Sequence, residues 1–294
     1  MIGLVAPGLI RSSVMGGVLL LGTFRAYAID LQPGDVKPLP PGTIFSQLSL
    51  RVSEFDGFYA DGQKQAGSID WDATRYQIRL GHFFEVFNLP AVAYIQTGLA
   101  NIDVDGALPG IDSGPEDTVA LLALWPYADN ATQRYFGVGA YGLFPTGSYK
   151  SDQGVFNVSE NRYSAALQLA FQKNFSESLI AVAAVDGVWF GSNDDFTAAR
   201  LSLEQEALYS AQLGLTYQAT QVLYVSASYF FTWGGETAID GVDQDNANEL
   251  HRYQLSAIAQ LPVGRLMLQY GGDLQRESGF FEERRAIVRF GQLF

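Results

Sequence analysis

The chain has 294 residues, a formal charge of −13 at pH 7 and no cysteine. The absence of cysteine excludes thiol catalysis and thiolate metal sites, and the acidic balance tells against a nucleic-acid-binding protein, which needs a basic face. The 20 phenylalanines, 15 tyrosines and 31 glycines are typical of a protein with many strands, aromatic belts and tight turns.

Residues 1–28 have the features of a secretory signal peptide. Arg11 supplies a positive charge, residues 14–24 form an apolar core, and Ala26-Tyr27-Ala28 matches a cleavage site. The apolar core is too short to cross a bilayer as a helix. We therefore expect the secreted chain to begin at Ile29.

The stretch that follows, residues 29–42, is rich in proline. Proline has no backbone N–H group to donate to a neighbouring strand. We expect this segment to form a strap or a plug-like lead-in rather than a strand, and if it entered a barrel it would narrow the lumen.

From residue 43 onward, the chain repeats a strand followed by a turn, and apolar and polar side chains alternate along the strands. Tyr209, Ala211 and Leu213, for example, alternate with Ser210 and Gln212. Successive side chains of a strand point to opposite faces of the sheet, so each strand has one apolar and one polar face. We expect twelve strands, near residues 43–58, 70–86, 91–102, 117–127, 133–148, 161–174, 178–191, 204–219, 222–235, 249–261, 264–275 and 283–294.

The connections between these strands alternate in length. Short turns are expected at 88–90, 174–178, 219–221 and 262–264, and long loops at 103–116, 149–160, 192–203 and 236–248. A soluble β-sandwich also shows alternation, but its strands are shorter. Long strands in even number, with short turns at one end and long loops at the other, indicate a bacterial outer-membrane barrel. We expect an all-β fold, an antiparallel up-and-down transmembrane barrel over residues 43–294.

The last strand carries Val288, Phe290 and Phe294 on one face. An aromatic residue at the end of such a strand resembles the signal by which outer-membrane barrels are recognised for assembly. We therefore expect the barrel assembly machinery, outer-membrane lipid and lipopolysaccharide among the partners of a protein in the outer membrane of a Gram-negative bacterium.

If the apolar faces meet lipid, the polar faces line the lumen. Twelve strands give a backbone diameter of roughly 24 Å, which leaves a path for one small molecule at a time. The charged residues could pair to hold the wall, or they could form a constriction that selects solutes. The candidates for lumen lining and selectivity are Arg51, Arg75, Arg79, Asp186, Glu206, Arg252, Asp273, Arg285 and Arg289.

Acidic residues cluster in the segments expected to form long loops. They are solvated loop residues or weak divalent-cation sites that bridge lipopolysaccharide, and none has the spacing of a calcium-binding loop. No resident metal or other cofactor is expected. The clusters are Asp103, Asp105, Asp112, Glu116 and Asp117; Asp194 and Asp195; and Asp240, Asp243, Asp245 and Glu249.

The sequence contains no recognisable catalytic motif. Its two histidines, His82 and His251, fall on the outward-facing parity of their strands. A hydrolase that uses one of them, like the twelve-stranded outer-membrane phospholipase, is an alternative, but we expect no enzyme and no catalytic residue.

Several motifs across the predicted mature chain resemble a family of outer-membrane transporters grouped as the "meta-pathway of phenol degradation". Tyr163 and Glu206 depart from the family pattern, which has Trp and Asp there. The resemblance implies a barrel, often encoded beside aromatic-degradation genes, that admits hydrophobic or aromatic compounds and is not an enzyme. The matching motifs are Gln32-Pro33-Gly34-Asp35, Pro40-Pro41-Gly42-Thr43, Tyr59-Ala60-Asp61-Gly62, Phe144-Pro145-Thr146-Gly147-Ser148-Tyr149, Glu160-Asn161-Arg162-Tyr163, Leu203-Glu204-Gln205-Glu206, Trp233-Gly234-Gly235-Glu236-Thr237, Asp240-Gly241-Val242 and Gly279-Phe280-Phe281-Glu282-Glu283.

The leading hypothesis is therefore a passive channel for small solutes, with aromatic or hydrocarbon-like compounds as the candidates. A hydrolase is one alternative. A structural or surface-interaction barrel that is blocked inside and acts through its acidic outer loops is another.

Overall fold

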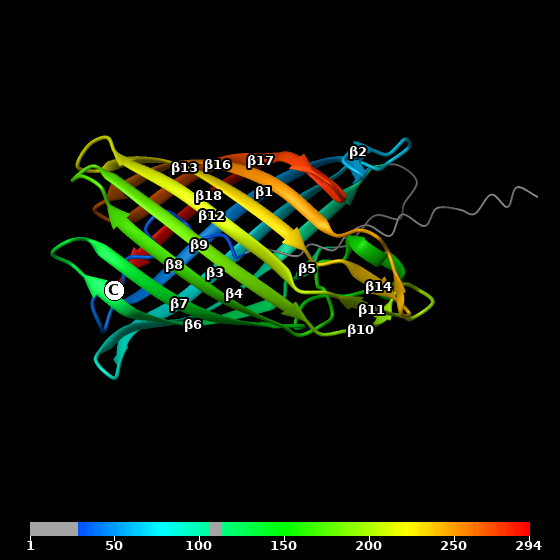
Figure 1. Ribbon diagram of the computed structural model, residues 1–294, viewed down its shortest axis with the longest axis horizontal. Coiled ribbons are helices and arrows are strands. Elements are labelled where there is room, and N and C mark those ends of the chain that lie inside the picture. Colours follow the sequence, from blue (N-terminus) through cyan, green and yellow to red (C-terminus); the bar gives the residue numbers. More distant parts are fainter. Residues whose placement is uncertain (1–28, 106–112) are drawn as a thin grey trace, which may run out of the picture.

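The computed structural model describes residues 29–105 and 113–294. The predicted signal peptide and Asp112 lie outside the described residues. Twelve long antiparallel strands form a closed barrel (Figure 1), which confirms the predicted fold class. The strands are β1 (Ile44–Ala60), β3 (Trp71–Val86), β4 (Leu89–Val104), β6 (Thr118–Asp129), β7 (Arg134–Phe144), β8 (Ser164–Asn174), β9 (Leu179–Phe190), β12 (Leu208–Gln218), β13 (Leu223–Gly234), β16 (Asn248–Leu261), β17 (Gly264–Arg276) and β18 (Gly279–Leu293).

The barrel closes where β18 pairs with β1. The register runs from Phe45 opposite Leu293 to Tyr59 opposite Gly279. Beyond the end of β18, the N–H of Phe294 donates to the carbonyl of Ile44 at 2.8 Å, and the N–H of Ile44 donates back at 3.1 Å. Strand β18 begins four residues earlier than predicted, because this first part of the strand pairs with the end of β1.

The outer surface of the barrel is apolar and much of its inner surface is polar. Leu213, Leu215 and Leu255 are between 52% and 62% exposed, whereas Gln212 and Gln254 are at most 5% exposed. A protein folded in water shows the reverse distribution, so the outward face is suited to lipid. Among the described residues, no helix is long and apolar enough to cross a membrane.

Short turns join the strands at one end of the barrel (Figure 1). The turn between β3 and β4 consists of Phe87 and Asn88, both with positive φ, which matches a two-residue type I′ hairpin turn. The sequence placed this turn at residues 88–90. The structure differs because Leu89 and Pro90 already pair with β3, and a proline is tolerated so close to a strand start.

The long connections at the other end contain structure that the sequence pattern did not predict. The short helix η1 (Ser151–Phe156) and the strands β10 (Asn193–Phe196), β11 (Leu201–Gln205), β14 (Thr237–Ile239) and β15 (Val242–Asp243) lie there, together with β2 (Gln63–Lys64) and β5 (Gly114–Pro115). Strands β10, β11, β14 and β15 form a separate small sheet (Figure 1). It exists because two loops distant in sequence pair with each other and bury Phe196, Leu203 and Ile239 together.

Candidate functional site: the lumen and the N-terminal strap

Residues 29–42, called the strap below, lie inside the barrel. The strap contains turns and no strand. Leu31 and Val36 are 9% and 2% exposed, and both belong to a core cluster with side chains of the barrel wall. The strap passes from the short-turn end, where Gly42 donates to the carbonyl of Phe83 at 2.7 Å, into the lumen.

One side of the strap is held by amide side chains and a tryptophan of the wall. The Leu31 N–H donates to Gln212 Oε1 at 3.0 Å, and Gln212 Nε2 donates back to the Leu31 carbonyl at 2.8 Å. Gln168 Nε2 donates to the Ile29 carbonyl at 2.7 Å, and Trp125 Nε1 donates to the Val36 carbonyl at 2.7 Å. These bonds satisfy backbone groups that the strap would otherwise bury without partners.

The other side of the strap is held by charged and polar side chains. Asp30 lies 2.6 Å from Arg252 Nη2 and 3.8 Å from Arg285 Nη1. Burial alone would raise the pKa of Asp30, but Arg252 and Arg285 outweigh it and hold the pKa below its ordinary value. Gln269 Nε2 donates to Gln32 Oε1 at 2.7 Å, so the polar contacts continue along the strap.

The inner wall therefore has two different halves. Strands β6–β9 present an apolar surface to the strap through residues such as Leu121, Trp125, Ala170 and Val182. This corrects the expectation of a uniformly polar lumen. The reason is that the strap fills the barrel, and the inner wall opposite its Leu31 and Val36 is then a packed protein core rather than a water-facing surface.

Eight of the nine predicted lumen residues lie on the inward face of their strands. Arg285 is 1% exposed, and the others are buried or half-buried: Arg51, Arg75, Arg79, Asp186, Arg252, Asp273 and Arg289. The prediction for Glu206 is wrong. Glu206 is exposed and lies between β11 and β12, because β12 begins only at Leu208 and strand alternation does not extend to Glu206.

Several of the buried charges of the described residues belong to two groups. Arg75 pairs with Glu116, whose other oxygen accepts from Gln77 Nε2 at 2.9 Å. Asp273 accepts from Arg276 Nε and from the Glu282 N–H, both at 2.9 Å. Arg285 lies 3.4 Å from Glu282, which connects the second group to Asp30.

Three carboxylates of these groups were not among the sequence candidates. Glu116 was assigned to an acidic loop but is 6% exposed, because the chain before β6 folds back against β4 as β5. Glu282 was placed before the start of the last strand. Asp30 lies in the strap, and no alternation pattern exists there to indicate its position.

The mouth at the long-loop end is lined by aromatic side chains. Phe156 of η1 is 8% exposed and lies 5.9 Å from Trp71 and 5.4 Å from Phe280, measured between ring centroids. Phe280 also meets Phe58 at 5.4 Å. A loop residue thus packs between strands β1, β3 and β18 and narrows the outer mouth.

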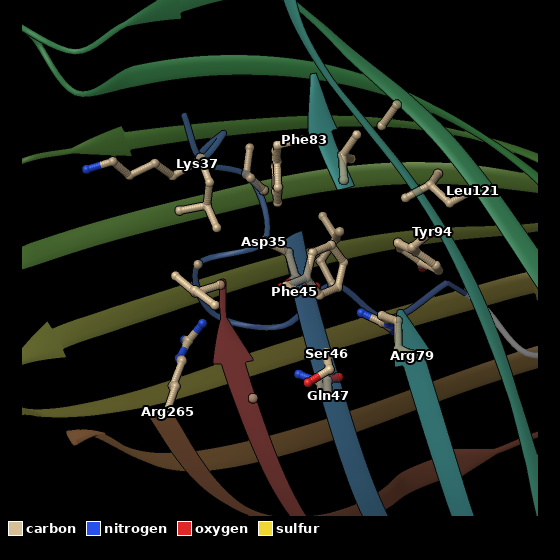
Figure 2. Close-up of a pocket in the computed structure, with 18 of the residues that line it drawn as sticks. Asp35, Lys37, Phe45, Ser46, Gln47, Arg79, Phe83, Tyr94, Leu121 and Arg265 are labelled. Atoms are coloured by element: carbon tan, nitrogen blue, oxygen red, sulfur yellow. The ribbon is translucent and has the colours of Figure 1, made fainter. Parts of the chain in front are cut away.

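At the short-turn end, a cavity of about 560 Å³ lies between the strap and the wall. Figure 2 shows Asp35 of the strap and side chains from several strands around it, among them Phe45, Arg79 and Tyr94. Arg79 Nε donates to Gln96 Oε1 at 3.0 Å, and its guanidinium lies 4.4 Å from the centre of the Tyr94 ring. The cavity is therefore lined by both aromatic and charged groups.

The two histidines lie away from the lumen. The ring of His251 contacts Tyr229 and stacks on Phe231 at 4.8 Å, and His82 stacks on Phe84 at 5.9 Å. These are contacts of an aromatic belt at the membrane surface. Within residues 29–105 and 113–294, no three His, Asp or Glu side chains are arranged to hold a metal ion.

The chain is similar to solved structures of known proteins. The COG4313 outer membrane channel from Pseudomonas putida F1 is 28% identical, and the alignment covers 90% of this chain and 100% of the channel with a TM-score of 0.83. The toluene transporter TodX from Pseudomonas putida is 9% identical, with 86% and 90% of the two chains covered and a TM-score of 0.49. No curated protein matches the chain.

The closed barrel, its apolar outer face and its likeness to the COG4313 channel place the protein in the bacterial outer membrane with a channel fold. The model of one protein family matches residues 57–290. The chain therefore belongs to the family described as "Putative MetA-pathway of phenol degradation".

Proposed function

We propose that the protein is a passive channel for small solutes and that the strap is its gate. The observation that carries this proposal is that the strap fills the lumen without being part of the wall. It is held by side-chain hydrogen bonds and by the ion pairs of Asp30. Release of the strap therefore breaks no strand pairing, and the ring of twelve strands stays intact.

The different chemistry of the two halves of the inner wall favours passage of a small, amphipathic solute. An apolar surface on β6–β9 faces a wall rich in arginine on β1, β3 and β18. A ring or a short hydrocarbon fits the first half and a polar group fits the second. Aromatic compounds that carry a polar substituent are the solute class that we propose.

The surface of the barrel also suits the other partners that we propose. The apolar outer face suits lipid, and the acidic loops suit lipopolysaccharide bridged by divalent cations. The terminal strand, with Val288, Phe290 and Phe294, is the proposed contact for the barrel assembly machinery.

The filled lumen also favours a second candidate function. A permanently blocked barrel would act through its outer end, where the small sheet and the acidic residues Asp194, Asp195, Asp240 and Asp243 are found. This protein would bind a partner at the cell surface and conduct nothing.

Conductance in planar bilayers separates the two candidates. We compare the mature chain with a variant that lacks residues 29–40 and with a control that lacks 65–67 in the loop after β2. The channel proposal expects brief openings of the intact protein, sustained conductance of the strap deletion, and intact behaviour of the control. Liposomes should admit phenol and benzyl alcohol faster after strap deletion. If the folded strap deletion passes neither ions nor these solutes, the channel proposal fails and the blocked barrel is supported.

A further inference from the structure

Arg79 forms no direct ion pair although it is half-buried inside the barrel. It donates a hydrogen bond to Gln96 and contacts the Tyr94 ring. Asp35 acts on it at longer range, and no carboxylate of residues 29–105 or 113–294 lies within 4.0 Å of it. A guanidinium removed from bulk water is stabilised by an anion. Its planar set of donors suits a carboxylate, which it binds through two parallel hydrogen bonds.

The cavity beside Arg79 has aromatic walls. Phe45 lies between Phe83 and Tyr94, with ring centroids at 5.8 and 6.4 Å, and Trp125 completes this side. The volume of about 560 Å³ is in the range of small-molecule sites, which combine mostly apolar walls with a few polar groups.

The charges around the cavity favour an anion. The cavity lining contains three cationic side chains, Arg79, Arg265 and Lys37, and one carboxylate, Asp35. Arg265 donates to the Pro33 carbonyl and Lys37 to Gln133, and Figure 2 shows Lys37 directed away from the labelled aromatic side chains. Arg79 is therefore the cation best placed to meet a ligand against the aromatic wall.

We propose that this cavity binds an aromatic carboxylate, with the carboxylate on Arg79 and the ring against Phe45, Phe83 and Tyr94. The inference rests on the proposed function and names the solute class for this part of the path. Asp35 opposes such a ligand through its like charge, so the strap and the solute compete for the same arginine-rich wall.

Calorimetry with the folded, detergent-solubilised barrel tests this site, using benzoate and its uncharged analogue benzyl alcohol, with empty micelles as the blank. We expect the Kd of benzoate to be at least about tenfold lower than the Kd of benzyl alcohol. Arg79→Gln should remove that preference and Asp35→Asn should increase the affinity for benzoate. Arg284→Gln is the matched control, because Arg284 is exposed on the outer face, and it should behave as the unmodified protein.

Equal affinities for benzoate and benzyl alcohol, or a benzoate preference that survives Arg79→Gln in a folded barrel, would overturn the site. Heat-modifiable migration on gels shows that each variant is folded. Because the measurement is equilibrium binding, its failure is distinct from failure of the channel: a barrel that conducts without preferring benzoate keeps its function and loses this site.

A different observation concerns Asp186. This residue is 7% exposed, and its Oδ2 accepts from Ser210 Oγ and from Gln168 Nε2. Its Oδ1 has no hydrogen-bond partner, and no cationic side chain of the described residues pairs with it. Burial of a carboxylate without a cationic partner is unfavourable in free energy.

The start of the strap lies directly beside Asp186. Gln168 Nε2, which meets Asp186 at 3.5 Å, donates to the Ile29 carbonyl at 2.7 Å, and the Ile29 N–H is hydrogen-bonded to Asp186. The sequence predicts cleavage between Ala28 and Ile29. Cleavage there replaces an amide with a positively charged α-ammonium group at the place where the cation is missing.

We infer that the α-ammonium group of processed Ile29 pairs with Asp186 and fastens the strap in the lumen. Removal of the predicted signal peptide would thus complete the plug.

Hydrogen exchange of residues 29–39, measured by mass spectrometry on the mature barrel, tests this pair without relying on conductance. Asp186→Asn and a glycine inserted between residues 28 and 29, which displaces the ammonium by about 3.5 Å, should each speed exchange at least about tenfold. The combined variant should be no faster than either, because both remove one interaction. Asp56→Asn, at an exposed site, is the control. A mature terminus other than Ile29, unchanged exchange in Asp186→Asn, or additive effects would each overturn the inference.

Discussion

Arg252 of β16 donates a 2.6 Å hydrogen bond to Asp30 of the strap, across 222 positions of the chain. Both side chains are nearly enclosed, at 10% and 12% exposure. Arg285 lies on the other side of the Asp30 carboxylate. This contact connects the segment that fills the lumen with the arginine-rich half of the wall.

Asp30→Asn should loosen the strap. The variant keeps the size of the side chain but leaves Arg252 without its anion, and breaking a buried pair costs about 3 kcal/mol. We expect longer and more frequent openings in planar bilayers at neutral pH. Asp56→Asn, which removes an exposed carboxylate, should have no such effect, and equal records for the two variants would contradict a clamp at Asp30.

At pH 7 and below, the opening should depend on pH only under clearly acidic conditions. Because the pKa of Asp30 in the docked strap lies below its ordinary value of 3.8, its ion pairs contribute stability above that value, and this stability is lost as the pH falls through the lowered pKa. Conductance of the unmodified barrel should therefore change little between pH 7 and pH 5 and rise below about 3.8.

The same titration of Asp30→Asn supplies the control for the pH experiment. This variant should conduct at neutral pH and show a weaker acid response, since the group that titrates is gone. A strap that opens in the unmodified barrel near pH 6 would assign the gate to a different group.

Covalent attachment of the strap should keep the channel closed. The chain has no cysteine, so Leu31→Cys with Gln212→Cys introduces the only two thiols, at positions whose native residues exchange two hydrogen bonds. A short, reducible bifunctional thiol reagent should suppress openings, and reduction should restore them. In each single-cysteine variant, which cannot form the cross-link, the reagent should leave the frequency of openings unchanged. Undiminished conductance after complete cross-linking would show that solutes bypass the strap.

Phe156→Ala should free the loop at the outer mouth. Removing a buried phenylalanine side chain costs on the order of 3 kcal/mol, and here the loss falls on the packing of η1 against Trp71 and Phe280. Trypsin should cleave after Lys150 faster than in the unmodified barrel. Phe87→Ala, at a turn residue that is 93% exposed, is the matched control, and similar cleavage in both would show that Phe156 does not anchor the loop.

Deletion of Phe294 should impair assembly. The residue is 70% exposed, yet its backbone exchanges two hydrogen bonds with Ile44 where the barrel closes. We expect a sharp fall in the heat-modifiable, folded fraction recovered from outer membranes. Phe294→Tyr keeps the aromatic end and the backbone, and it should assemble normally. Normal recovery of the deletion would remove the assembly role of this residue.

The amino-acid sequence by itself determined the wall of the barrel. Alternation with a period of two is a local property, and in Gln212, Leu213 and Ser210 it already assigns faces correctly, because a strand must send successive side chains to opposite sides. The alternation of short and long connections likewise indicated which end carries loops. The alternation gave the wrong position for Glu206, because this residue precedes the first residue of β12.

Only the tertiary structure decided what fills the barrel. The contacts of Asp30 with Arg252 and of Leu31 with Gln212 join positions more than 180 residues apart, and no local period encodes such pairs. The alternation places Arg252 inside the barrel but does not reveal its partner, because Asp30 lies on the strap, which has no alternating pattern. The apolar half of the lumen follows for the same reason: it packs against the strap, and its character depends on a segment that is not part of the wall.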